Sequence, residues 1–344
     1  MKETVWWMPD YFEKFTCKTD KCRNTCCRMW KIPVTRKKYN QLITMDCSEE
    51  LDQNLQQAFI LPQVVSEERF REIGFNYLGE CRLMKGGYCS LHAEKGEDYL
   101  PEICRLFPRS YKKINDQNLA IASNACEKVV ELIYESERLD LRKKEYSAMP
   151  MQSIQISEEN AAMILKFQLI FQNSDKKLYQ KIAQVCRIVN YDAFTADENK
   201  ADDPVSTAIF LLHHLIGRNS ALYPYTNTVI RRYEENPELY ELDKETFDSM
   251  FPDWMPFYER LINNSMMYEN FPFVDESFDN TDAYKGLCCT YGLLRFLSIG
   301  YTAVHPSKED WVDVIAALFH LVDHTAFYKN ITYYPVNAAC MLKL

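Results

Sequence analysis

The sequence predicts a mainly α-helical protein, in which a cysteine-rich domain with short β-hairpins precedes an α-helical bundle. Nine of the thirteen cysteines lie between residues 17 and 126, while apolar residues recur at helical spacing almost throughout residues 157–326. Between these regions, residues 139–155 are charged, lack clear periodicity and contain Met149-Pro150. We therefore predict a cysteine-rich domain over residues 1–138, a linker over residues 139–155 and a helical domain over residues 156–344.

The composition is that of an ordinary globular protein, and it narrows the classes of partner. The chain has 344 residues, of which 47% are hydrophobic and 26% are charged, enough for two modest domains. Its formal net charge of −9 argues against nucleic acid as the main partner and is compatible with a cationic substrate such as a lysine side chain. No stretch approaches the roughly 18 apolar residues of a membrane span, so we expect a cytoplasmic protein without a membrane partner.

Four cysteines fall within eleven residues, a density that core packing does not explain. They lie in the segment Cys17-Lys-Thr-Asp-Lys-Cys22-Arg-Asn-Thr-Cys26-Cys27, whose basic residues favour the thiolate form that binds metal. The odd total of thirteen cysteines argues against a disulfide framework. Cys47 alone is left unassigned in this domain. We therefore predict a metal-binding domain with eight candidate ligands: Cys17, Cys22, Cys26, Cys27, Cys81, Cys89, Cys104 and Cys126.

Two kinds of metal centre use such ligands. Thiolates hold both iron–sulfur clusters and tetrahedral zinc, and the spacing does not separate the two. Cys26 and Cys27 are adjacent and cannot easily bind one metal atom in regular structure, so they either reach different irons of a cluster or include one spare thiol. The aromatic segment 6–12 before the loop, with Trp30 and Ile32 after it, is predicted to exclude water from the site.

Short helices and two hairpins are predicted along the first domain. The helices are expected at residues 35–44, 48–60, 66–73, 97–107 and 127–136. Ser48 is placed to cap the second of them, with acidic residues in its first turn. One hairpin, over residues 80–92, turns at Gly86-Gly87 and brings Cys81 close to Cys89. The other, over residues 114–123, leads to Cys126 at a helix N-terminus, where the pKa of a thiol is lowered.

Amphipathic stripes predict helices through most of the second domain. After a first helix from residue 157, they recur over residues 176–190, 204–217, 225–235, 254–270, 283–301 and 308–326. His320 and His324 share one face of the last stripe and resemble an inverted zinc-protease motif, but no third ligand is evident. A polar contact between helices is the favoured interpretation. Cys288 and Cys289 lie among apolar residues and are predicted to be buried.

At these residues the chain resembles the flagellin lysine-N-methylase family. The resemblance continues into residues 258–271 and 293–297, and so spans most of the chain. Arg82 and Glu127-Lys128 stand where the family usually has Pro and Pro-Glu, but neither departure removes a ligand. In the first domain the matching segments are residues 11–15, Cys22-Arg-Asn-Thr-Cys26-Cys27-Arg-Met-Trp30-Lys-Ile32, residues 81–89, Cys104-Arg105-Leu-Phe-Pro108-Arg109 and Cys126.

The resemblance implies transfer of a methyl group from S-adenosylmethionine to surface lysines of flagellin, or of another lysine-bearing protein, by a protein that carries a [4Fe-4S] cluster. Neutral lysine nitrogen is a good nucleophile, so the displacement needs only alignment and loss of a proton from a group of pKa about 10.4. A radical is not required, and the C-x-x-x-C-x-x-C triad of radical enzymes is absent because Met29 takes its third position. The sequence identifies neither the general base nor the S-adenosylmethionine site.

Other classes of protein remain open on the same residues. One is a non-catalytic scaffold, in which zinc or an iron–sulfur cluster stabilises a helical protein that binds a partner. Another is a redox partner, or an enzyme that modifies a different peptide. An ordinary dinucleotide-binding or phosphate-loop domain is disfavoured, because none of the nine glycines falls in the corresponding glycine-rich motifs.

Overall fold

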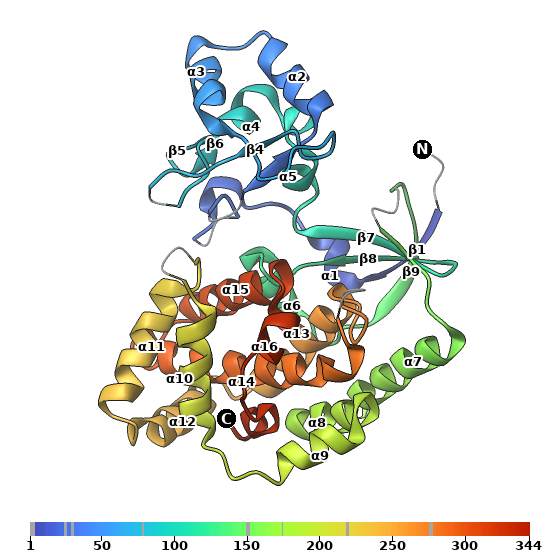
Figure 1. Cartoon of the computed structure of the whole chain (residues 1–344), viewed down its shortest axis with the longest axis vertical. Helices are drawn as coiled ribbons and strands as arrows, with labels where there is room; N and C mark the ends of the chain where they lie inside the picture. The colour runs from blue at the N-terminus through green and yellow to red at the C-terminus, as the bar shows by residue number, and fades with distance from the viewer. Residues whose placement is uncertain are drawn as a thin grey trace. The chain divides into compact units, whose positions relative to one another are not determined.

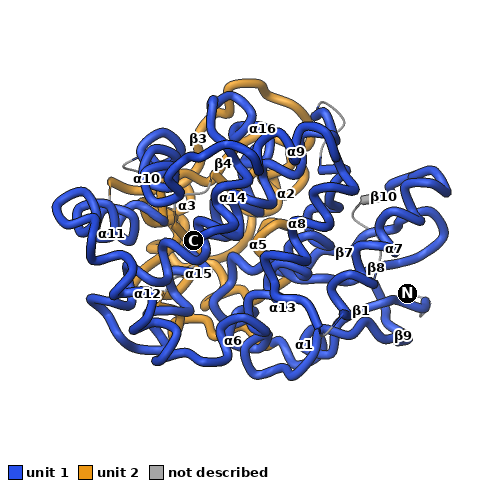
Figure 2. Tube along the Cα trace, turned by 90° about the horizontal axis from the view of Figure 1, so that it is seen from below, with its two compact units in different colours: residues 1–15, 108–218, 222–344 blue, residues 16–107, 219–221 orange. Residues whose placement is uncertain are grey.

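The computed structural model describes residues 4–23, 26–28, 31–77, 79–148, 152–173, 175–217, 220–274 and 278–344. The chain divides into two compact units, shown in different colours in Figure 2. Unit 1 comprises residues 1–15, 108–218 and 222–344, and unit 2 comprises residues 16–107 and 219–221. Trp30, predicted beside the metal site, lies outside the described residues, as do residues 149–151 of the predicted linker.

These boundaries differ from the predicted division into residues 1–138, 139–155 and 156–344, because the first strand pairs with late ones. Strand β1 (Thr4–Pro9) lies parallel to β8 (Gln117–Ala122) and antiparallel to β9 (Leu141–Tyr146). The predicted linker supplies β9 and β10 (Gln152–Ile154), the two edge strands of a five-stranded sheet of order β10-β7-β8-β1-β9 (Figure 1). Strand β9 is mostly charged and exposed, as edge strands often are, and so shows no apolar periodicity.

The sheet also takes the aromatic residues at the start of the chain into unit 1. The predicted second hairpin is confirmed with longer strands, β7 (Arg109–Ile114) and β8, and turns at Asn115, whose φ is 50°. Trp6 is fully buried and meets Tyr111 of β7 edge to face, with ring centroids 5.5 Å apart. Helix α1 (Asp10–Lys14) buries Tyr11 and Phe12. These aromatics therefore belong to the core of unit 1, whereas the cysteine-rich loop that follows them is part of unit 2.

The rest of unit 1 is helical, as predicted. Helix α14 is buried along nearly its whole length and packs against α8, α11, α12, α15 and α16 (Figure 1). Helices α9, α12 and α16 were not predicted. Among the described residues, no helix combines the length and apolar character needed to cross a bilayer. The helices are α6 (Glu127–Glu135), α7 (Glu158–Gln172), α8 (Leu178–Val189), α9 (Tyr191–Glu198), α10 (Pro204–Leu215), α11 (Tyr223–Glu235), α12 (Leu239–Met250), α13 (Trp254–Tyr268), α14 (Ala283–Thr302), α15 (Lys308–His324) and α16 (Phe327–Thr332).

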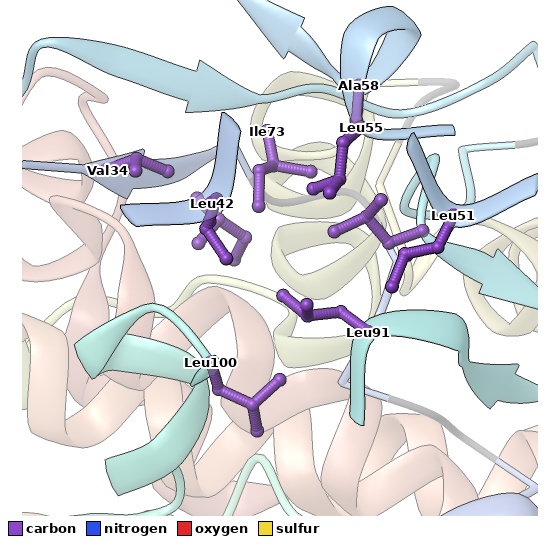
Figure 3. Close-up of a cluster of buried hydrophobic side chains, with 10 residues drawn as sticks. Val34, Leu42, Leu51, Leu55, Ala58, Ile73, Leu91 and Leu100 are labelled. Atoms are coloured by element: carbon purple, nitrogen blue, oxygen red, sulfur yellow. The ribbon is translucent and has the colours of Figure 1, made fainter. Parts of the chain in front are cut away.

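Unit 2 is built on a small core of aliphatic side chains. Leu42, Leu51, Leu55 and Leu91 point toward one another and are each at most 2% exposed (Figure 3). The hydroxyl of Ser48 accepts a hydrogen bond from the backbone N–H of Leu51, so the predicted cap is confirmed. The elements around this core are β2 (Ile32–Val34), α2 (Arg36–Thr44), α3 (Glu49–Ala58), β3 (Phe59–Ile60), β4 (Arg71–Ile73), β5 (Met84–Lys85), β6 (Tyr88–Cys89), α4 (Ser90–Lys95) and α5 (Glu102–Leu106).

Two of the predicted helices of unit 2 are wrong. The predicted helix 66–73 ends in strand β4, which pairs antiparallel with both β2 and β3 and buries Ile73 in the core. This long-range pairing overrides the local helical preference of the charged residues before it. The predicted helix 97–107 is broken into a 3₁₀ turn, Glu97–Tyr99, and α5, because Pro101 precedes α5 at its cap and cannot continue a helix.

Close packing around α14 predicts that a methyl group cannot be added at Gly292. A Cβ there would lie 2.6 Å from Cβ and 2.9 Å from the backbone oxygen of Met341. We expect Gly292→Ala to lower the free energy of unfolding by about 1–3 kcal/mol through overpacking, measured by urea denaturation. Gly217→Ala is the matched control, since no described atom lies within 4 Å of its new Cβ. Equal stability of the two variants would contradict this view of the packing.

Candidate functional site

Four of the predicted ligands in unit 2 come together at the cysteine loop, the first hairpin and α5. The backbone N–H of Cys81 donates to the carbonyl of Cys27 at 2.7 Å, which joins the hairpin to the loop. Strands β5 and β6 pair Met84 with Cys89, and the turn between them has positive φ at both Gly86 and Gly87. The predicted hairpin is therefore confirmed. Cys104 completes the group from α5.

Cys27, Cys81, Cys89 and Cys104 are within electrostatic range of one another, and we name them the thiol cluster. Burial, with smaller contributions from charge on Cys27 and Cys89, raises the pKa of Cys81 to about 12. Burial, and then charge on the other three sulfurs, likewise holds the pKa of Cys104 well above its usual value. Without a cation, four thiolates here would be desolvated and would repel one another. Soft, converging thiol ligands of this kind suit a metal centre.

The ligand geometry does not match a single ion. Among the described residues, no group of three or more His, Cys, Asp or Glu side chains is placed to hold one metal ion. His92, close to the hairpin, stacks on Tyr88 with ring centroids 5.7 Å apart.

The other predicted ligands are placed differently. Cys17 and Cys26 are exposed and Cys22 is half-buried, all on the segment that leads into the thiol cluster. Cys126 lies in unit 1, where it caps α6. Metal binding by any of the eight cysteines stays a prediction. Cys47 packs against the aliphatic core of unit 2, and Cys288 and Cys289 are buried in α14 as predicted.

A second group of titratable side chains lies in unit 1, where the end of β8 meets α13 and α15. At its centre Asp323 is buried and accepts hydrogen bonds at both carboxylate oxygens. Oδ2 accepts from the Ser123 hydroxyl at 2.7 Å and from the Asn124 backbone N–H at 3.1 Å, and Oδ1 accepts from the Ser265 hydroxyl at 3.1 Å. Burial raises the pKa of Asp323 to about 7, even though these hydrogen bonds oppose the shift.

Lys112 and Glu269 extend this group with opposite charges. The Lys112 ammonium donates to Oδ1 of Asn270 at 3.0 Å and to the backbone carbonyl of Tyr268 at the end of α13. Burial lowers the pKa of Lys112 to about 8, against the attraction of Glu269 and Asp323. Burial also holds the pKa of Glu269 well above its usual value. Removal from water therefore brings the pKa values of a cation and two carboxylates toward neutrality.

The two histidines of α15 border the same group. Nε2 of His324 lies 3.0 Å from the Ser123 hydroxyl, and the rings of His324 and His320 are 6.1 Å apart. Burial lowers the pKa of His324 to about 4 and that of His320 to about 3, so both are neutral at pH 7. The contact predicted between helices is made instead to the loop after β8, where Ser123 lies. The group is not a nucleophilic triad, because Asp323 binds Ser123 and not an imidazole.

Sequence reasoning did not find Asp323, Lys112 or Glu269. The sequence did contain a signal for Asp323. It is an acidic residue between His320 and His324, on the apolar stripe of the last predicted helix. The sequence contained no signal for Lys112. In a strand with one exposed face, the residue after buried Tyr111 is expected to face solvent, but both side chains are buried on β7. Glu269 lies just after α13, and only the folded chain brings it close to Lys112.

Comparison with known proteins places most of this second group, but not Lys112, within a recognised domain. A family model described as the FliB lysine N-methylase C-terminal domain matches residues 115–334, which is more than half of the chain. The protein class is thus that of lysine-modifying methylases, and the chain belongs to the FliB lysine N-methylase family. The matched residues include Asp323, His324 and Glu269, whereas residues 16–107 of unit 2 precede them. No curated protein and no solved structure gave a match.

The buried histidines predict acid sensitivity. An unfolded histidine takes up a proton near pH 6.5, whereas His320 stays neutral in the folded protein down to pH about 3. Stability is therefore lost as the pH falls below 6.5, by on the order of 2 kcal/mol for this group between pH 7 and pH 5. We expect the free energy of unfolding, measured by urea denaturation, to fall between pH 7 and pH 5 in the wild type. In His320→Gln this fall should be smaller by about 2 kcal/mol.

Exposed His213 provides the control for this experiment. Its imidazole pairs with Glu234 at the surface, so His213→Gln should reproduce the fall in stability of the wild type. An identical fall in the wild type and in His320→Gln would show that His320 is not held neutral by burial.

Proposed function

We propose that the protein transfers methyl groups from S-adenosylmethionine to lysine side chains of a protein substrate, with flagellin as the first candidate. The observation that carries this proposal is the family match over residues 115–334, within which lies a group of side chains suited to moving a proton. The acidic character of the chain, with a net charge of −9, supports a substrate that presents ammonium groups.

We further propose that the thiol cluster holds a [4Fe-4S] cluster, with zinc as the alternative metal. Four thiols from the loop, the hairpin and α5, each within electrostatic range of the others, are ligands that both centres use. When bound, an iron–sulfur cluster would supply an anionic, redox-active centre and cross-link these segments of unit 2. The methyl transfer described next uses only the residues of unit 1.

The reaction needs a group that accepts a proton from the substrate. The lysine ammonium must lose a proton before its nitrogen can attack the methyl carbon. The new N–C bond then forms as the C–S bond breaks, and S-adenosylhomocysteine leaves with the electron pair on sulfur. A base is most effective when its pKa is close to the working pH. Asp323, with a pKa raised to about 7 by burial, meets that condition.

A chain of hydrogen bonds connects buried Asp323 with the half-buried His324. In the tautomer with a proton on Nε2, His324 donates to the Ser123 hydroxyl at 3.0 Å, and Ser123 donates to Asp323 at 2.7 Å. A proton that enters at the imidazole can therefore pass to the carboxylate without exposing it to water. Asn124 and Ser265 hold the two carboxylate oxygens in place by donating hydrogen bonds. In this proposal His324 receives the proton of the substrate and Asp323 stores it.

The test is the intact mass of flagellin incubated with the purified protein and S-adenosylmethionine across a range of pH. Mass increments of one methyl are expected, at a rate that falls as the pH drops through about 7 and Asp323 takes up a proton. Asp323→Asn should lower the rate at pH 7 by about 10²-fold or more and abolish this inflection. Ser123→Ala should slow the reaction while leaving the carboxylate in place.

Asp313→Asn, a buried acid on the same helix, is the matched control and should keep the wild-type profile. Flagellin that gains no methyl from the wild-type protein would overturn the proposed function. An unchanged pH profile in Asp323→Asn would instead overturn only the assignment of the base.

The thiol cluster predicts which cysteines retain the metal. Anaerobically purified protein should be brown, and Cys81→Ser and Cys104→Ser should each lose iron and visible absorption because a ligand is missing. Cys47→Ser, from the same unit but outside the thiol cluster, should keep both. A colourless wild-type protein that contains zinc would select the alternative metal. Full metal content in both Cys81→Ser and Cys104→Ser would reject the site.

A further inference from the structure

Unit 1 contains a hollow of about 1140 Å³ that is separate from the residues of the proposed proton transfer. Its walls come from α8, α12, α13 and α14 and from the 3₁₀ turn Ala338–Lys343. None of the residues of the Asp323 group lines it. The wall combines charged side chains with apolar ones, among them Tyr179, Met255 and Leu342, as sites for small organic ligands commonly do.

The charge of the wall is opposite to that of the protein. Six basic side chains line the hollow against three acidic ones, although the chain as a whole carries a net charge of −9. Arg187 and Glu198 neutralise each other through two hydrogen bonds of 2.6 and 2.8 Å. The remaining excess of positive charge, with Lys244 and Arg295 on facing helices, favours an anion over a cation such as a lysine side chain.

Arg295 is the unusual group of this wall. Its side chain is 1% exposed, and its guanidinium lies 3.8 Å from the centre of the Trp254 ring. Nη1 is 2.9 Å from Oδ1 of Asp248, but the contact lacks hydrogen-bond alignment. Neither Nε nor Nη1 has a hydrogen-bond partner among the described residues. A buried guanidinium with unsatisfied donors is costly, which indicates that the site is completed by an acceptor from outside the chain.

Asp248 is the natural competitor of such an acceptor. Its side chain is 44% exposed in the wall of the hollow, whereas Arg295 is buried behind it. An incoming oxyanion must share the guanidinium with this carboxylate and is repelled by it. Removing the charge of Asp248 should therefore strengthen the binding of an anion, an effect that a merely structural ion pair would not produce.

We propose that this hollow binds a small organic molecule that carries an oxyanion, a carboxylate or a phosphate, which completes the hydrogen bonding of Arg295. The apolar part of the ligand lies against Tyr179, Met255 and Leu342. The inference does not rest on the proposed function. The methyl donor of that function carries a carboxylate, and so does its product, which makes the product one of two natural sources of the anion to be compared.

The test is isothermal titration of the full-length purified protein with four probes. S-adenosylhomocysteine offers a carboxylate, adenosine 5′-monophosphate offers a phosphate, inorganic phosphate is the anion alone, and adenosine is the uncharged control. At least one anionic probe should bind more tightly than adenosine. Its affinity should fall about tenfold or more in Arg295→Gln and should fall less in Lys244→Gln. Asp248→Asn should raise it several-fold.

Lys285→Gln changes a basic residue of α14 that does not line the hollow and should leave the affinity unchanged. Binding of S-adenosylhomocysteine alone identifies a carboxylate ligand, and binding of the phosphate probes identifies a phosphate ligand. The proposal is overturned if no anionic probe binds, or if Asp248→Asn and Lys244→Gln bind as the wild type does. Neither of those two side chains is fully buried, so both variants keep the test valid should Arg295→Gln fail to fold. Because flagellin is absent, a failure of methyl transfer does not affect the result.

Discussion

Burial of ionisable groups without a full set of opposite charges is the constraint on which the features of this protein depend. Moving a charge out of water is unfavourable, so a folded chain either pairs the charge, neutralises it by shifting its pKa or leaves it for a ligand. The described residues show each response. Hydrogen bonds partly compensate Asp323, loss of the proton keeps His320 neutral, burial holds the pKa of Cys104 well above its usual value, and Arg295 has two nitrogens without a hydrogen-bond partner among the described residues.

Local signals were enough to predict part of the fold. Ser48 at a helix start and Gly86-Gly87 at a hairpin act through neighbouring residues, and both were predicted correctly. The pairing of β1 with β8 and β9 joins residues more than a hundred positions apart, and no short window of sequence contains that information. The helix predicted over residues 66–73, where strand β4 forms, was wrong for the same reason. The predicted division of the chain into consecutive domains therefore missed that unit 2 is inserted after α1 and before β7.

The candidate sites show the same contrast. Cysteine has few common roles at such density, so the sequence indicated a metal site, and the hairpin indicated that Cys81 and Cys89 would meet. Acidic and basic residues are numerous and usually lie on the surface, so the sequence could not single out Asp323, Lys112 or Arg295. Their character comes from burial, which depends on how α13, α14 and α15 pack. The family match then links one of these buried groups with lysine N-methylation.

The central claim is that a lysine nitrogen of a protein substrate receives its methyl group from S-adenosylmethionine on this protein. The most direct measurement uses a donor with a deuterated methyl group, purified flagellin, and peptide mass spectrometry to locate the label. The account predicts trideuteromethyl groups on lysine Nζ that depend on the protein being present. Flagellin without label, or with label on other side chains only, would contradict it.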